Sequence, residues 1–244
     1  MKRTLPLSLP TLLILLAASM FFGSCTSSPP EPTAEAETPY VSDEERDRMP
    51  EDGAQALEWL LEGNARFVEG RPRHDFESQR RRMMLTEGQH PFGVVLGCAD
   101  SRVPPELIFD FGLGDLFVIR VAGNVVADDE AGSIEYAIAH LDVPLVLVLG
   151  HEGCGAVTAA LDKHDNEVAE LDGLLRMIQP AVADIDPSLP EASRIHLGVE
   201  ANVRQSVKRL LEIAEREARP DEERVLVVGA VYELDTGHVR ILDD

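Results

Sequence analysis

The chain has 244 residues, which is enough for one domain with a sizeable core and does not require two. Its hydrophobic fraction of 44% and charged fraction of 27% are ordinary for a globular protein. Its formal net charge of -22 is not ordinary, and it argues against a nucleic-acid partner because phosphate binding requires a basic surface.

The N-terminus has the pattern of a bacterial secretion signal: two basic residues precede an apolar run over residues 5–22. The run ends in Phe-Gly-Ser-Cys, which resembles a lipobox, so we expect a signal peptide over residues 1–24 and lipid on Cys25. Acyl chains would then anchor the exported protein to a bacterial membrane, with the folded domain in the periplasm. The outer membrane is favoured because Thr26 follows the cysteine where an inner-membrane retention signal usually places Asp. The alternatives are an ordinary signal cleaved near Cys25 or an uncleaved anchor.

Residues 25–50 are rich in Pro, Ser, Thr and Glu and cannot bury a core, so they predict a disordered linker between the lipid and a folded domain over residues 51–244. That domain is expected to begin with a helix from about Gly53 to Phe67, since apolar residues recur there at helical spacing.

Apolar runs then alternate with amphipathic segments. Expected strands cover residues 92–96, 116–121, 144–149 and 224–228, and expected helices cover residues 106–111, 134–141, 156–161 and 197–218. A terminal hairpin is expected from strands 231–234 and 239–242 around an Asp-Thr-Gly turn. Strands alternating with helices predict a single α/β domain with a mostly parallel central sheet flanked by helices.

Two glycine-containing turns carry the chemistry. Cys98 and Asp100 follow the first expected strand, and His151 and Cys154 follow the third. Parallel strands would bring all four to the carboxyl edge of the sheet, where open α/β sheets bind ligands. Two thiolates, one imidazole and one carboxylate suit a tetrahedral zinc site.

Catalytic zinc usually has three strong protein ligands and a fourth position for water. The three ligands expected here are Cys98, His151 and Cys154. Asp100, steered by Arg102, could accept a hydrogen bond or proton from the water, or could itself ligate zinc and close the site. Backbone N–H groups near Gly155, at the start of a helix, could hold a developing anion.

Two other interpretations of this cluster are possible from the sequence. Cys98 and Cys154 could form a disulfide in an oxidising periplasm, but His151 and the Asp100–Arg102 pair would then have no task. The site could instead be structural zinc with four closed ligands, but such sites usually stabilise small domains and this chain has ample apolar core.

The stretches Cys98-Ala99-Asp100-Ser101-Arg102 and His151-Glu152-Gly153-Cys154 together resemble the motifs of the β-class carbonic anhydrases. The resemblance covers about residues 53–244 and extends to the stretch Ala122-Gly123-Asn124. It implies a β-carbonic-anhydrase-like fold, one Zn²⁺ per chain, and reversible hydration of carbon dioxide to bicarbonate and a proton by a zinc-bound hydroxide that Asp100 orients.

The resemblance also implies a substrate pocket. Its residues would be Gln89, Val103, Phe117, Tyr136 and Gly155. Family members are homodimers or larger homo-oligomers with pockets at subunit interfaces, so Gln89, Phe117 and Tyr136 can come from different chains. Two alternatives remain open: hydrolysis of carbonyl sulfide or carbon disulfide on the same zinc site, and a non-catalytic periplasmic zinc-binding protein, against which the intact Asp100–Arg102 pair argues.

Overall fold

The protein is described here by a computed structural model of residues 49–74, 77–162, 169–217 and 225–243. The expected signal peptide, the expected lipid site Cys25 and nearly all of the expected linker lie outside the described residues. Within the described part, no helix combines the length and the apolarity that crossing a membrane would need.

Five strands form one sheet in the order β2-β1-β3-β4-β5. Their bounds are β1 Gly93–Gly97, β2 Leu116–Arg120, β3 Leu145–His151, β4 Leu226–Tyr232 and β5 Val239–Ile241. The first four run parallel, and β5 returns antiparallel along β4. The expected mostly parallel sheet is thereby confirmed.

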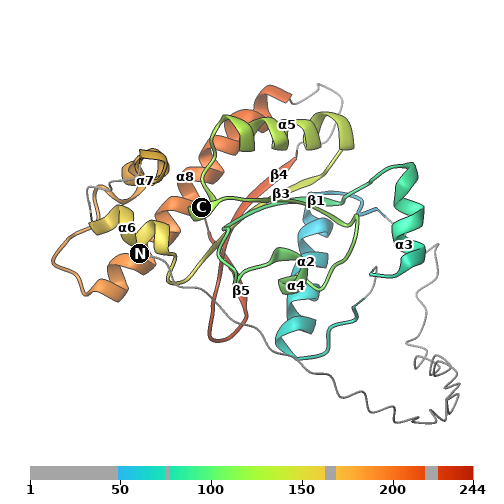
Figure 1. The fold of residues 1–244 in the computed structure, drawn as a ribbon, viewed down its shortest axis with the longest axis horizontal. Coiled ribbons are helices and arrows are strands. Elements are labelled where there is room, and N and C mark those ends of the chain that lie inside the picture. The colour runs from blue at the N-terminus through green and yellow to red at the C-terminus, as the bar shows by residue number, and fades with distance from the viewer. Residues whose placement is uncertain (1–48, 75–76, 163–168, 218–224, 244) are drawn as a thin grey trace, which may run out of the picture. The chain divides into compact units, whose positions relative to one another are not determined.

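Helices cover both faces of this sheet (Figure 1). Their bounds are α2 Gly53–Val68, α3 Gln79–Met84, α4 Pro105–Ile108, α5 Asp128–Leu141, α6 Gly155–Asp162, α7 Ala169–Val182 and α8 Glu191–Glu217, with short 3₁₀ turns η1 Leu85–Glu87 and η2 Ala122–Asn124. Helices α2 and α4 pack together on one face, while α5 and α8 cover the other, and α6 and α7 pack against α8.

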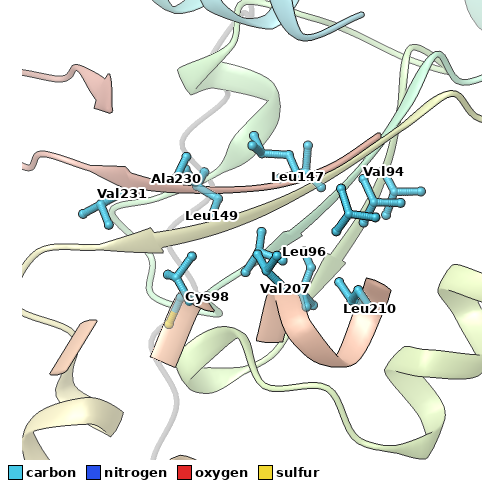
Figure 2. Close-up of a cluster of buried hydrophobic side chains, with 14 of the residues drawn as sticks. Val94, Leu96, Cys98, Leu147, Leu149, Val207, Leu210, Ala230 and Val231 are labelled. Carbon is cyan, nitrogen blue, oxygen red and sulfur yellow. The ribbon is translucent and has the colours of Figure 1, made fainter. Parts of the chain in front are cut away.

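The core lies on both faces of the sheet, with α8 covering one face and α2 and α4 the other. Strands β1 and β3 are buried along their whole length, which is why their sequences are continuous apolar runs. Figure 2 shows Leu96 and Cys98 on the side of the sheet where Val207 and Leu210 of α8 pack. Glycine at position 150 allows this close packing, since a Cβ there would lie 2.5 Å from Val203 Cγ2 of α8.

The structure corrects several expected boundaries. The helix expected over residues 106–111 ends at Ile108, and Asp110 follows it in the left-handed region with φ 53°. The strand expected over 224–228 and the first hairpin strand are one element, β4, which pairs with β3 and β5. Helix α7 was not expected, and α8 begins at Glu191 rather than near residue 197.

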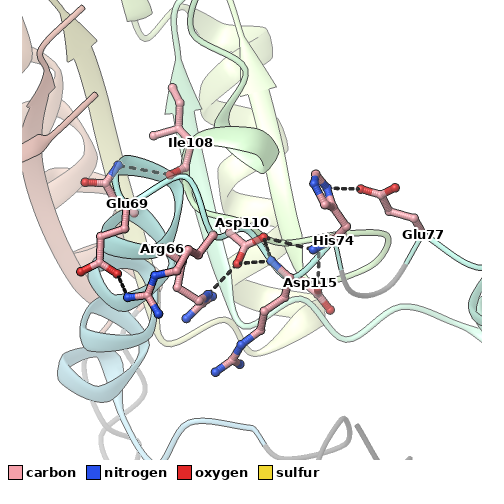
Figure 3. A network of polar contacts seen from close by, with 11 residues as sticks. Arg66, Glu69, His74, Glu77, Ile108, Asp110 and Asp115 are labelled. Atoms are coloured by element: carbon pink, nitrogen blue, oxygen red, sulfur yellow. Dashed lines mark hydrogen bonds and ion pairs between the residues drawn. The ribbon is translucent and has the colours of Figure 1, made fainter. Parts of the chain in front are cut away.

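A polar network around Asp110 connects α2, and the residues that follow it, to the end of α4 (Figure 3). Its side chain is 3% exposed, and it pairs with Arg66 Nε of α2 at 2.5 Å. It also accepts hydrogen bonds from the backbone N–H groups of Arg73 at 2.9 Å and His74 at 3.4 Å. This buried carboxylate therefore fixes the path of the chain between α2 and α3.

Candidate metal centre

Two neighbouring parallel strands deliver the three expected metal ligands. Cys98 follows the last residue of β1, and His151 is the last residue of β3, the strand that pairs with β1. Cys154 immediately precedes α6, after a turn in which Gly153 adopts φ 59°. The three side chains are buried, and their ligand atoms lie within 4.8 Å of one another.

This arrangement fits a tetrahedral zinc ion. Bonds of about 2.3 Å to sulfur and about 2.0–2.1 Å to nitrogen separate the ligand atoms of such an ion by roughly 3.5–3.8 Å, so small adjustments suffice. The His151 ring nitrogen Nδ1 lies 2.9 Å from the carbonyl oxygen of Glu152, which places the proton on Nδ1. The other nitrogen, Nε2, is buried and has no hydrogen-bond partner among the described residues, as expected for a metal ligand.

The two cysteines are free thiols and not a disulfide. A hydrogen bond from Cys154, together with the nearby His151 ring and the backbone N–H groups of Asp100 and Gly123, lowers the pKa of Cys98 to about 4 despite its burial. The hydrogen bond to Cys98, together with burial, raises the pKa of Cys154. The metal-free pair therefore shares one proton, which a metal ion would displace.

Asp100 stands beside the ligands and is held by Arg102. The guanidinium donates to both carboxylate oxygens, from Nε to Oδ1 at 2.9 Å and from Nη2 to Oδ2 at 2.7 Å. This side-chain bond holds the pKa of Asp100 well below its usual range, so the carboxyl stays ionised. Its Oδ2 lies 3.9 Å from His151 Nε2. In this arrangement Asp100 faces the ligand cluster without belonging to it.

Two groups that donate hydrogen bonds to Cys98 were not expected from the sequence, and we call them the supports of Cys98. Arg120, the last residue of β2, donates from Nε to the carbonyl oxygen of Cys98 at 2.9 Å and from Nη2 to that of Asp100 at 2.6 Å. Gly123 of η2 donates its backbone N–H to Cys98 Sγ at 3.3 Å. The position of Arg120 at the carboxyl end of a predicted strand was the signal that could have shown the first support.

The expected pocket residues divide into two groups. Val103 is buried and donates its N–H to the Asp100 carbonyl at 3.2 Å, and Gly155 is the first residue of α6, with open space where a side chain would be. Both lie at the metal edge of the sheet.

The others lie toward the amino ends of the strands. Gln89 is exposed ahead of β1, and Phe117 pairs in register with Val94 near the start of that strand. Phe117 contacts Tyr136 of α5, with ring centroids 6.4 Å apart. A five-residue strand such as β1 spans about 13 Å, so this group is remote from Cys98 within one chain.

A buried ligand cluster flanked by an ionised Asp–Arg pair, at the carboxyl edge of a parallel sheet, defines the site of a metal-dependent α/β enzyme. Comparisons with known proteins give the family. A family model described as carbonic anhydrase matches residues 93–239. Carbonic anhydrase 2 of Mycobacterium tuberculosis is 43% identical over 195 residues, which cover 75% of this chain and 90% of that protein.

Solved structures agree with that family. One of two tetrameric β-carbonic anhydrases from Sordaria macrospora matches with a TM-score of 0.61 and 26% identity, over 78% of this chain and 98% of that one. A Coccomyxa β-carbonic anhydrase in complex with acetazolamide matches with a TM-score of 0.60 and 28% identity, over 76% of this chain and 86% of that one. The chain belongs to the carbonic anhydrase family, and within it to the β class.

Proposed function

We propose that the protein catalyses the reversible hydration of carbon dioxide to bicarbonate and a proton, with one Zn²⁺ per chain held by Cys98, His151 and Cys154. The observation that carries this proposal is the buried three-ligand cluster beside an ionised Asp100. When bound, zinc would act as a Lewis acid that lowers the pKa of water toward about 7 and so provides a nucleophile near neutral pH.

The protein's own groups would orient this reaction. The Oδ2 of Asp100 lies close enough to the ligand cluster to accept a hydrogen bond from the water and to direct its lone pair toward the substrate. Arg102 keeps that carboxylate ionised and fixes its orientation through bonds to both of its oxygens. Val103 supplies an apolar wall for carbon dioxide, and the N–H of Gly155, the first residue of α6, supports the oxygens of bicarbonate.

Rates with carbon dioxide, carbonyl sulfide and carbon disulfide, measured on the purified protein, test this proposal. We expect fast hydration of carbon dioxide and inhibition by acetazolamide, the ligand of the Coccomyxa enzyme. Faster turnover of either sulfur compound would assign the same zinc site to hydrolysis of that compound. A zinc-loaded protein that turns over none of the three would be a zinc-binding protein only.

We further propose that the active pocket needs a second copy of the chain. Gln89, Phe117 and Tyr136 are far from the metal edge of their own subunit, yet Tyr136 is 48% exposed and Gln89 is exposed, so both are available to a partner. A symmetric dimer presents the same surface twice, and each pocket group can then complete the other subunit's site. The tetrameric Sordaria relatives support a homo-oligomer.

Mixing two inactive variants gives a direct test of a shared pocket. Cys98→Ser removes a ligand, while the double variant Gln89→Ala with Phe117→Ala removes the pocket group and keeps the ligands. After equal co-expression, half of the dimers are mixed and one of the two sites in each is intact, so activity should recover to about a quarter of wild type. Each variant expressed alone is the control, and a mixture no more active than the controls would contradict a pocket built from two chains.

We also propose that Cys25 carries lipid and anchors the exported protein to the outer membrane. Support comes from the sequence: the apolar run over residues 5–22, the small residues at 23 and 24, and the absence of Asp after the cysteine. Mass spectrometry of the mature N-terminus should find an acylated Cys25. An unmodified N-terminus at another residue would rule the lipid out, and a Cys25→Ser variant released from membranes would support it.

A further inference from the structure

Two buried polar side chains of α8 donate hydrogen bonds to η2, the turn that contacts Cys98. Asn202, which is 1% exposed, donates from Nδ2 to the carbonyl oxygen of Gly123 at 2.7 Å. Ser206, which is 3% exposed, donates from Oγ to the carbonyl oxygen of Asn124 at 2.9 Å. The two residues are four apart and therefore share one face of the helix. That face is otherwise apolar where it meets the sheet, so the polar pair requires an explanation.

The turn that they hold, η2, has an unusual backbone. Gly123 has φ 70° and Asn124 has φ 44°, both in the left-handed region that side chains disfavour. A side chain at position 123 would also be obstructed, because its Cβ would lie 2.7 Å from Ile178 Cδ1 of α7. Glycine is therefore required there, and glycine is the residue whose backbone turns most freely when nothing holds it.

Gly123 connects α8 to the metal ligand through a single residue. Its carbonyl accepts from Asn202, and its N–H donates to Cys98 Sγ at 3.3 Å. The two groups flank the same Cα, so only the φ and ψ angles of Gly123 separate their directions. Fixing the carbonyl therefore aims the N–H at the sulfur.

A second buried asparagine provides a comparison for Asn202. Asn64 of α2 uses its whole amide: it donates to the carbonyls of Ile108 at 3.2 Å and Gly237 at 2.9 Å, and it accepts from the N–H of Val239 at 2.9 Å. The Oδ1 of Asn202 is buried and accepts no hydrogen bond from the described residues. An amide used for only one bond is a poor means of gaining stability, since its unpaired oxygen lowers that stability.

We infer that Asn202 is a positioning residue for the metal centre, which holds the Gly123 carbonyl so that the Gly123 N–H stays on the Cys98 sulfur. This inference rests on the proposed function, because it assumes that Cys98 is a zinc ligand. A hydrogen bond to a ligating thiolate withdraws charge from the sulfur and fixes its direction, and the loss of such outer partners typically weakens metal binding 10–100-fold. Asn202 would thus set both the affinity of the site and the charge that Cys98 gives to the ion.

Cobalt(II) in place of zinc makes that charge visible, because the energy of a thiolate-to-cobalt charge-transfer band reports on the sulfur. In Asn202→Ala the thiolate loses its donor and becomes easier to oxidise, so the band should move to longer wavelength. Zinc affinity, measured by chelator competition, should fall about 10-fold. Asn64→Ala is the matched control: it removes a buried helix asparagine whose hydrogen bonds go to Ile108, Gly237 and Val239 and not to η2, and it should lower the unfolding temperature while leaving band and affinity unchanged.

Asn202→Ser creates a smaller void and is the second test variant if the alanine variant does not fold. It should shift the charge-transfer band in the same direction. A folded Asn202 variant with wild-type band and zinc affinity would overturn the inference while leaving the zinc site intact. A band shift of equal size in Asn64→Ala would overturn it as well, because the effect would then be general loosening. A wild-type protein with no thiolate–cobalt band would instead overturn the zinc assignment.

Discussion

Replacing His151 with Ala, or Cys98 with Ser, is expected to abolish hydration and to reduce bound zinc from one ion per chain to almost none. His151 is buried and its Nε2 has no hydrogen-bond partner among the described residues, so removing the ring removes a ligand. Arg102 holds both oxygens of the neighbouring Asp100 carboxylate, so that group is not free to take the place of the ring. Without the ion, the pKa of water returns to its much higher bulk value, and almost no hydroxide is available at neutral pH. Activity should therefore drop to the uncatalysed background.

Metal analysis and hydration rates on the same preparations check this. His196→Ala is the matched control, because His196 is an exposed histidine of α8 that faces Glu200 and not the ligand cluster. It should keep its zinc and its rate. If His151→Ala and Cys98→Ser both kept a full equivalent of zinc, the ligand assignment would be wrong.

Local sequence patterns were sufficient for the central strands β1 and β3, but not for β4, which was expected as two strands. Strands β1 and β3 are buried on both faces, so each is a continuous apolar run that ends in a glycine-containing turn. Helix α7 was harder to predict because Gly173 and Pro180 interrupt its helical pattern. It is stabilised instead by packing against α6 and α8 through buried residues such as Ile178. The early start of α8 had a local signal, since Pro190 stands directly before its first residue.

The site likewise combines residues that a local sequence pattern predicts with contacts that form only in the folded structure. Cys98 and His151 could be placed together because they terminate strands that a parallel sheet brings side by side. The supports of Cys98 were harder to find, although the place of Arg120 at the end of a predicted strand was one signal. Arg120 is 22 residues from Cys98 and Asn202 is 79 residues from Gly123, and each contact exists only after the tertiary structure has formed. A lone asparagine in an amphipathic helix carries no local sign of the turn that it will hold.

The last prediction concerns Asp100 and Arg102, and it separates orientation of the nucleophile from metal binding. Asp100→Asn nearly preserves the shape but replaces one acceptor oxygen with a donor, which misaligns the water. Single acid–base groups contribute about 10²–10⁴-fold, and we expect a loss at the low end of that range with zinc retained.

Arg102→Ala should lose more activity than Asp100→Asn. The carboxylate would lose the guanidinium bonds to both of its oxygens and keep only the bond from the backbone N–H of residue 102. It would then be free to turn toward the metal, 3.9 Å from His151 Nε2, and compete with water.

The pH profile distinguishes these effects. Arg102 holds the pKa of Asp100 below its ordinary value of about 3.9, so this carboxyl is already ionised at neutral pH and cannot cause any rise above it. We expect a rise toward alkaline pH in the wild type from ionisation of water at the metal, and Asp100→Asn should lower the plateau without removing the rise. Hydration rates and zinc content for both variants across pH give the comparison. Rates near wild type at alkaline pH in either variant would mean that the pair does not orient the nucleophile.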